Sequence, residues 1–147
     1  RLRALSFKAK SSNTSNRESY TYIFRVCESA EIDPNIDPSA GLIQRDDTGN
    51  RLKVIGRINT TRVIGGSDWI LLIYGDGDPY GTHCNQEKRK AMVMISCNPN
   101  VLGGGFTVVV EEREKVSDCF YLFKLDSSVA CAAVTRSLST GSILLIL

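Results

Sequence analysis

The expected fold follows from residues 69–97, WILLIYGDGDPYGTHCNQEKRKAMVMISC. Its two ends, WILLIY at 69–74 and AMVMISC at 91–97, are rich in β-branched and other apolar residues, as buried strands are. Between them, GDGDPYG at 75–81 gathers glycine, aspartate and proline, the residues that turns favour. The stretch therefore predicts two strands separated by a turn-rich connection.

Further runs of the same character predict an all-β domain. They are SYTYIFRVC at 19–27, LKVIGRI at 52–58, FTVVVEER at 106–113 and CFYLFKL at 119–125. Turn-forming clusters separate these runs, and short strands at such spacing favour a sandwich or barrel. GGG at 103–105 lacks the Lys and Ser or Thr of a Walker loop, so we expect a hairpin loop there. The partial amphipathic pattern of RLRALSFKAK at 1–10 predicts a short N-terminal helix.

The composition fits one compact domain and argues against nucleic acid as a partner. The 147 residues, 42% of them apolar and 23% charged, can bury a core of their own. A net charge of +2 provides no broad basic field of the kind that nucleic acid requires. GSILLIL at 141–147 is far shorter than the roughly 20 residues of a membrane span. It fits either a terminal core strand or the beginning of a transmembrane helix.

The cysteines point to disulfides and to the secretory pathway. None of them forms a CxxC pair of the kind that binds zinc or makes a redox dithiol. Two N-glycosylation sequons, at Asn13 and Asn59, indicate the same compartment, because glycans and disulfides are both added there. The number of cysteines is odd, and the spacing of the cysteines does not fix which of them pair. They are Cys27, Cys84, Cys97, Cys119 and Cys131.

The sequence offers no catalytic constellation. His83 is the single histidine, so a Ser-His-Asp or Cys-His machinery would have to use it. Its neighbour Cys84 would be the nucleophile, but adjacent residues on a strand point to opposite faces, and Cys84 is expected in a disulfide. The carboxylates of Glu111 and Glu112 diverge for the same reason, which argues against a glycosidase pair. We therefore expect a binding protein and not an enzyme.

Six segments together carry a resemblance to one known family. They run from about Tyr20 to the C-terminus: SYTYIFRVC, AGLIQ at 40–44, VIGRIN at 54–59, SDWILLIY at 67–74, HCNQEKRKAMVMISCN at 83–98 and EEREKVSDCFYLFKLDSSVAC at 111–131. In their order and spacing the chain resembles the mannose 6-phosphate receptor (P-type lectin) family, in its cation-dependent branch. The resemblance implies a flattened β-barrel or sandwich of two crossed antiparallel sheets, with no catalysis.

The resemblance also implies a mannose-binding set: Gln44, Arg89, Glu111 and Tyr121. An amide, a guanidinium, a carboxylate and a phenol supply complementary partners for hydroxyls that both donate and accept. Taken singly, the arginine and the glutamate would fit surface charges, and the tyrosine would fit a core position. Four matches in register favour the sugar site.

The implied phosphate pocket consists of His83, Thr82 and Tyr20. A free imidazole titrates at about pH 6.5, near the second ionisation of a phosphate monoester at about 6, which gives a physical basis for pH-dependent release. We expect acid to weaken binding by reducing the phosphate charge and neutralising Glu111, whereas a protonated His83 would oppose this.

One position departs from the family pattern. Where the family has an aspartate that contacts a divalent cation beside the phosphate, this chain has Gly81. Hard cations such as manganese prefer carboxylate oxygens, and glycine has no side chain to offer. Asp78 or Asp76 in the preceding turn is a weaker candidate ligand. We expect no required cofactor and weak or absent cation dependence.

The resemblance further assigns the cysteines and the glycan. It places the partner of Cys27 upstream of Arg1 and the family's glycosylated position at Asn59, with Asn13 as a second sequon. It implies two disulfides: Cys84 with Cys119 and Cys97 with Cys131.

As a whole, the resemblance implies a sorting receptor. Residues 1–142 would form the lumenal mannose 6-phosphate-binding domain, and 143–147 would begin the transmembrane segment of a single-pass type I protein. The receptor would be a homodimer that binds phosphomannosylated lysosomal hydrolases in the trans-Golgi and releases them in acidic endosomes on the lysosomal pathway. The alternative is a mannose-binding lectin of the secretory pathway for unphosphorylated glycans, because Gly81 and Thr82 depart from the family pattern. A purely structural ectodomain would bind no sugar.

Overall fold

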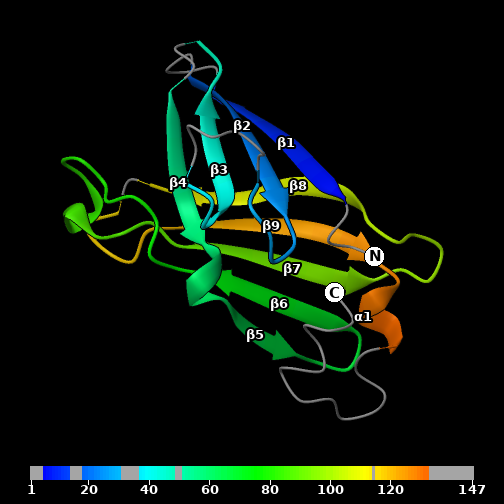
Figure 1. The fold of residues 1–147 in the computed structure, drawn as a ribbon. Coiled ribbons are helices and arrows are strands. Elements are labelled where there is room, and N and C mark those ends of the chain that lie inside the picture. The colour runs from blue at the N-terminus through cyan, green and yellow to red at the C-terminus, as the bar shows by residue number, and fades with distance from the viewer. Residues whose placement is uncertain (1–4, 14–17, 31–36, 49–50, 114, 133–147) are drawn as a thin grey trace.

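A computed structural model describes residues 5–13, 18–30, 37–48, 51–113 and 115–132, which fold into two crossed β-sheets (Figure 1). The first sheet has the order β1-β2-β3-β4 and the second β5-β6-β7-β9-β8. The strands are β1 (Ser6–Asn13), β2 (Glu18–Arg25), β3 (Ala40–Asp46), β4 (Leu52–Arg57), β5 (Arg62–Gly65), β6 (Trp69–Tyr74), β7 (Ala91–Cys97), β8 (Gly104–Glu112) and β9 (Phe120–Ser127). Three one-turn helices are η2 (Ile58–Thr60), η3 (Cys84–Gln86) and α1 (Val129–Ala132). The predicted all-β class with two crossed sheets is confirmed.

Residues 69–97 form the two strands that their sequence predicts. β6 and β7 occupy 69–74 and 91–97, the bounds of the two apolar runs. Along β6 the buried side chains alternate with half-buried ones, so Ile70, Leu72 and Tyr74 face the core. Period-two burial is what one covered face of a sheet imposes. One pairing differs from the expected antiparallel arrangement, because β7 and β9 run parallel.

The predicted N-terminal helix is wrong over the residues that the structure describes. Ser6–Asn13 form strand β1, which pairs antiparallel with β2. Phe7 and Ala9 are buried, whereas Ser6, Lys8 and Lys10 on either side of them are exposed, so the pattern has the period of a strand. Only two apolar positions carry this pattern, and they fit a short amphipathic helix almost equally well.

Two strands and one turn also differ from expectation. The sequence shows no alternation over β3 because Ala40–Gln44 are buried throughout, as happens when both faces of a strand are covered. β5 is an exposed edge strand of four residues, too short to stand out. The expected GGG hairpin loop is wrong, since β8 begins at Gly104 and β7 pairs with β9. Gly105 has a φ of 65°, a conformation that glycine adopts readily, at an irregularity in the β8–β9 register.

Phenylalanines from both sheets form the centre of the core. Phe24 of β2 lies 5.5 Å from Phe106 of β8, and Phe106 lies 5.2 Å from Phe123 of β9, measured between ring centroids. Phe7 of β1 stacks on Phe24 at 6.1 Å. Truncating a buried phenylalanine to alanine typically costs about 3–5 kcal/mol, so this cluster holds the two sheets in a fixed relation. β1 and β8 contact each other here, and close one side of the flattened sandwich.

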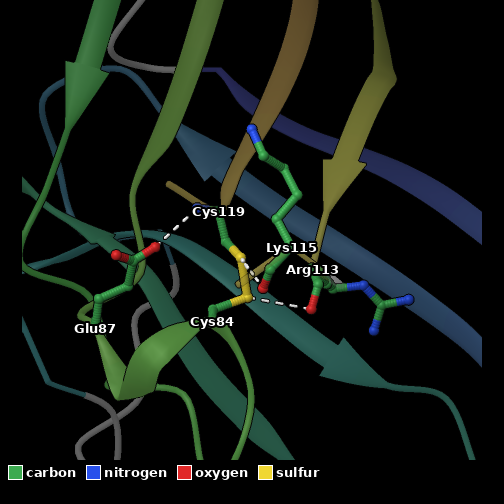
Figure 2. The surroundings of a disulfide bond; sticks show 5 residues. All are labelled: Cys84, Glu87, Arg113, Lys115 and Cys119. Carbon is green, nitrogen blue, oxygen red and sulfur yellow. Dashed lines mark hydrogen bonds between the residues drawn. A yellow bond between two sulfur atoms is a disulfide. The ribbon is translucent and has the colours of Figure 1, made fainter. Parts of the chain in front are cut away.

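Two disulfides fasten the connections to the second sheet. They join Cys84 to Cys119 and Cys97 to Cys131, the pairs that the resemblance implies. Figure 2 shows the first, with the Cys119 backbone amide donating a hydrogen bond to Glu87 Oε1 at 2.7 Å. The Cys84 sulfur lies 3.1 Å from the carbonyl oxygen of Arg113. This bridge therefore ties the loop after Gly81 to the ends of β8 and β9.

The membrane segment expected at 143–147 lies outside the described residues. Among the residues that the structure does describe, no helix is long and apolar enough to cross a bilayer.

Candidate functional site

The interior becomes polar toward one end of the sandwich. Directly paired residues in neighbouring strands place their side chains on the same face of a sheet. One inward-facing row crosses all four strands of the first sheet: Ala9, Tyr22, Gln44 and Lys53. The next row continues outward with Ser11, Tyr20 and Asp46. The second sheet contributes the pair Glu111 and Tyr121. Three of the four predicted mannose ligands therefore lie in these paired rows.

Tyr22 connects two of the predicted ligands across the sandwich. The Gln44 side-chain amide donates a hydrogen bond to the Tyr22 hydroxyl at 3.0 Å, and that hydroxyl donates to Glu111 Oε2. The other carboxylate oxygen of Glu111 accepts a hydrogen bond from the Ser11 hydroxyl. Burial raises the pKa of Tyr22, and the bond to Glu111 raises it further, so the hydroxyl stays protonated and remains a donor. Both oxygens of Glu111 are thereby held in place.

The Tyr121 hydroxyl is a buried polar group with unused hydrogen-bonding capacity. Its ring is fully buried and lies 5.8 Å from that of Tyr22. The hydroxyl lies beside that of Tyr80, and neither group meets hydrogen-bond geometry with any described residue. Burial and the neighbouring Tyr121 raise the pKa of Tyr80, so it too remains a neutral phenol. Each hydroxyl can still donate and accept.

Arg89 is a buried guanidinium aimed at the same region. The residue is 7% exposed, and Nη1 donates to the carbonyl oxygens of Asp78 and Pro79 at 3.1 and 2.8 Å. The guanidinium lies 4.4 Å above the Tyr80 ring, a favourable cation–π contact. Its Nε is buried and has no hydrogen-bond partner among the described residues. Burying a charge with a donor unused is unfavourable unless a ligand uses it.

A pocket of about 340 Å³ opens beside these groups. Its lining comes from β2, from the hairpin of β3 and β4, and from the segment before β7: Tyr20, Gln44, Asp46, Thr48, Arg51, Lys53 and Arg89. Gln44 and Arg89, both predicted mannose ligands, line the pocket directly. Glu111 joins them through Tyr22, and Tyr121 packs behind Tyr22.

The predicted phosphate residues divide into two groups. Tyr20 lines the pocket, and its hydroxyl accepts a hydrogen bond from Arg113 Nη1 at 3.3 Å. Gly81, Thr82 and His83 are exposed in the loop before η3 and do not line the pocket. The His83 ring meets Tyr80 edge-on, at 4.9 Å between centroids, so Tyr80 stands between His83 and Arg89.

Comparison with known proteins identifies the family. A family model described as mannose-6-phosphate receptor matches residues 1–147. The chain belongs to the mannose-6-phosphate receptor family. It is 49% identical over 148 residues to the cation-dependent mannose-6-phosphate receptor of Rattus norvegicus, covering all of this chain and 52% of the relative. It is 50% identical over 129 residues to that of Homo sapiens, covering 88% of this chain and 46% of the relative. The chain thus spans about half the length of the curated relatives it matches.

A solved structure supports the fold. Domain 11 of the chicken IGF2R aligns with a TM-score of 0.58 at 18% identity, covering 92% of this chain and 86% of the other. At that identity the likeness concerns the fold alone.

The carboxylates of the turn before Gly81, where the resemblance implies a divalent cation, are engaged within the protein. Gly81 has open space around it, since an added Cβ would meet no atom within 4 Å, but it brings no ligand. Asp76 pairs with Lys88 at 2.8 Å. Asp78 accepts a hydrogen bond from a β4 backbone amide at 2.8 Å and pairs with Arg57 at 3.1 Å. Over the described ranges, no group of three or more His, Cys, Asp or Glu is arranged to hold a metal.

The remaining predicted positions belong to the periphery. Asn59 is exposed in η2, where a glycan would be sterically free. The sequon at Asn13 continues into residues outside those described. Cys27 lies outside both disulfides, and its backbone amide donates to the Tyr74 hydroxyl at 3.0 Å.

Sequence reasoning missed the residues that hold the predicted ligands. Tyr22 could have been found, because the alternation in SYTYIF places it on the same face as Tyr20. Ser11 lies in a strand mistaken for a helix, so no local signal marked it. Tyr80, which contacts both Arg89 and His83, appeared only as a turn residue.

Proposed function

We propose that this domain is a lectin that binds mannose 6-phosphate and holds the mannose ring with Gln44, Arg89, Glu111 and Tyr121. The observation that carries the proposal is unused hydrogen-bonding capacity in a buried setting. Arg89 Nε and the Tyr121 hydroxyl are both buried without a hydrogen-bond partner in the described structure. Each such group costs about 1–3 kcal/mol unless something satisfies it. The hydroxyls of a hexose are chemically suited to do so.

The recognition chemistry follows from the donors and acceptors present. Arg89 donates only, an ionised Glu111 accepts only, and Gln44 and Tyr121 do both. A hexose hydroxyl can bridge an acceptor and a donor at once, so its position on the ring is read by two side chains. A sugar with a hydroxyl missing or inverted would leave buried groups unpaired, which is how such sites discriminate. No step in this account makes or breaks a covalent bond.

The phosphate would lie toward Tyr20 and the exposed loop that carries Thr82 and His83. We propose that binding weakens as the pH falls, because a phosphate monoester loses charge near pH 6. A protonated His83 would oppose this effect by attracting the anion. With Gly81 in place of the family's aspartate, we propose that binding needs no divalent cation.

We propose that the receptor is a homodimer that associates through the outer face of the second sheet. The register there aligns apolar, partly exposed side chains of four strands: Ile64, Leu71 and Met94 in one row, and Ile73, Met92 and Leu122 in the next. Contiguous exposed apolar surface of this kind usually marks an interface. A flat sheet face can pair with its own copy about a two-fold axis. A Met94→Lys substitution should then shift the sedimentation of the domain from dimer to monomer.

For the whole protein we propose a single-pass membrane receptor of the Golgi and endosomes. Residues 1–142 would be its lumenal lectin domain, and residues 143–147 would begin its membrane anchor. Its ligands would be phosphomannosylated lysosomal hydrolases, bound in the trans-Golgi and released in acidic endosomes. The support is family membership and the similarity to cation-dependent receptors over the full length of this chain.

One observation favours a second candidate function, a lectin for unphosphorylated mannose. Thr82 and His83, on which phosphate selectivity rests, do not line the pocket, whereas Gln44 and Arg89 do. A site that used only the latter residues would accept mannose and mannose 6-phosphate equally.

Retention on an immobilised phosphomannosylated hydrolase tests these functions against each other. The domain should be retained at pH 6.5, eluted by mannose 6-phosphate but not by mannose, and released near pH 5. Chelation of divalent cations should leave retention unchanged. Equal elution by both sugars would favour the second candidate, and absence of retention would favour a structural ectodomain.

A further inference from the structure

The pocket extends beyond the proposed mannose ligands onto the hairpin of β3 and β4. Lys53 is paired with Gln44, so its side chain lies on the same face and continues the row past the sugar site. Arg51 lies at the next position outward, where its carbonyl oxygen accepts a hydrogen bond from the Asp46 amide. Both cations line the pocket. One end of the cavity is therefore basic and the other holds Gln44 and Arg89.

Among the described residues, the two cations of this hairpin have no side-chain partner. Arg51 and Lys53 are exposed, and in the part of the chain that the structure describes neither takes part in an ion pair or a side-chain hydrogen bond. The acid opposite Arg51 is engaged locally, since Asp46 Oδ1 accepts hydrogen bonds from the amide and the hydroxyl of Thr48 at 2.9 and 2.8 Å. A second observation points to a ligand in the same cavity, namely the buried and unpartnered Nε of Arg89.

We propose that Arg51 and Lys53 form a subsite for a second anionic group of the ligand, a phosphate or a carboxylate beyond the first sugar. This inference rests on the proposed function, because it assumes that a glycan occupies the Gln44 end. The register gives the direction: a ligand anchored on Gln44 that leaves the pocket across β4 passes over Lys53, and Arg51 lies in the next row outward. Guanidinium and ammonium groups both pair with such oxyanions, and arginine can do so with two parallel hydrogen bonds.

The subsite adds selectivity more than affinity. Exposed ion pairs contribute little individually, so the two cations together should tighten a doubly charged ligand by about 2- to 10-fold. The gain should fall at high salt, because both side chains are solvent-exposed. A ligand without a second anion should gain nothing.

The double variant Arg51→Gln/Lys53→Gln tests the subsite, with Lys8→Gln as matched control. Lys8 is an exposed lysine of the same sheet whose side chain points away from the core. Four ligands are compared by calorimetry: mannose 6-phosphate, a singly phosphorylated glycan on a neutral peptide, the same glycan on an aspartate-rich peptide, and a doubly phosphorylated glycan on the neutral peptide. The double variant should lose about 2- to 10-fold on at least one of the last two ligands and nothing on the first two.

Each outcome of this comparison has a defined reading. A loss confined to the doubly phosphorylated glycan identifies a glycan phosphate, and a loss confined to the aspartate-rich peptide identifies a carboxylate of the polypeptide. Unchanged binding of all four ligands would overturn the subsite. An equal loss on mannose 6-phosphate would also overturn it, because the two cations would then belong to the primary site.

A titration with inorganic phosphate separates this inference from the proposed function. Amide resonances of residues 51–53 should shift in the wild-type domain, and the shifts should vanish in the double variant. If these shifts occur in a domain that binds no mannose 6-phosphate, the proposed function fails, and Arg51 and Lys53 remain an anion site with no sugar beside it. Absence of shifts at the hairpin, together with unchanged ligand affinities, refutes the subsite alone.

Discussion

Replacing Tyr22 by phenylalanine should weaken sugar binding without unfolding the domain. The substitution keeps the buried ring against Tyr121 and Phe123 and removes only the hydroxyl. That hydroxyl accepts a hydrogen bond from the Gln44 side chain and donates one to Glu111, so both proposed ligands lose an orienting contact.

The expected magnitude follows from the number of side chains released. Immobilising a flexible side chain on binding costs about 0.5–1.5 kcal/mol. With Gln44 released and Glu111 still held by Ser11 alone, binding should weaken by about 0.5–3 kcal/mol, which is about 2- to 150-fold in Kd. Because burial keeps the pKa of Tyr22 well above its usual value, the hydroxyl is a donor at every physiological pH. The loss should therefore be the same at pH 5.5 and pH 7.5.

Calorimetric titration with mannose 6-phosphate, paired with thermal unfolding, measures both consequences. Tyr74→Phe is the matched control, since Tyr74 is also fully buried and its hydroxyl bonds only to Cys27 in the described structure. Both variants should be mildly destabilised, and only Tyr22→Phe should lose affinity. Unchanged affinity in Tyr22→Phe, or an equal loss in both variants, would refute the positioning role of this hydroxyl.

Three further predictions concern manganese binding, the Cys84–Cys119 disulfide and the loss of stability in acid. Gly81→Asp should make mannose 6-phosphate binding respond to manganese, because the position is open and the new carboxylate would lie in the loop of His83; an identical Kd with and without chelator would contradict this. A Cys84→Ala/Cys119→Ala variant, which opens a bridge across a sequence separation of 35, should lose about 4 kcal/mol of unfolding free energy in urea titrations. A loss below about 1 kcal/mol would contradict the explanation that this disulfide stabilises the fold by restricting the denatured chain. Hydrogen bonds from the Thr21 and Ser19 hydroxyls lower the pKa of Asp47, so its contribution is fully present above the unfolded value of about 3.9 and is lost progressively as the pH falls through the lower, folded value. Asp47→Asn should therefore be less stable than wild type at pH 7, and the difference should shrink progressively as the pH falls below about 3.9. A difference that stays undiminished in acid would contradict this origin.

The strands that the sequence predicts best are those whose signal is local. β6 and β7 lie at the bounds of their apolar runs because each run is dense and is flanked by turn residues. β1 was mistaken for a helix because its pattern rests on Phe7 and Ala9 alone, and pairing with β2 decides between the two periods. β3 shows no period because its buried residues face core on both sides.

The residues of the candidate site were also predictable only in part. Gln44, Arg89, Glu111 and Tyr121 could be named from the resemblance, but the hydroxyls that hold Glu111 come from Tyr22 and Ser11 on neighbouring strands. Their roles depend on contacts between residues about 100 and 90 positions apart, which no local pattern encodes. The same holds for Lys53, whose place beside Gln44 is a consequence of strand register.

The measurement that tests the central claim most directly is a nuclear magnetic resonance titration of the isotopically labelled domain with mannose 6-phosphate. We expect the largest shifts at the Arg89 Nε–H and the Gln44 side-chain amide, because the first lacks a partner in the described structure and the second lines the pocket. Mannose at the same concentration should produce smaller shifts or none. If these two resonances stay unchanged while the ligand binds elsewhere, or if mannose reproduces the same shifts at the same concentration, the account of a phosphomannose site at this pocket is wrong.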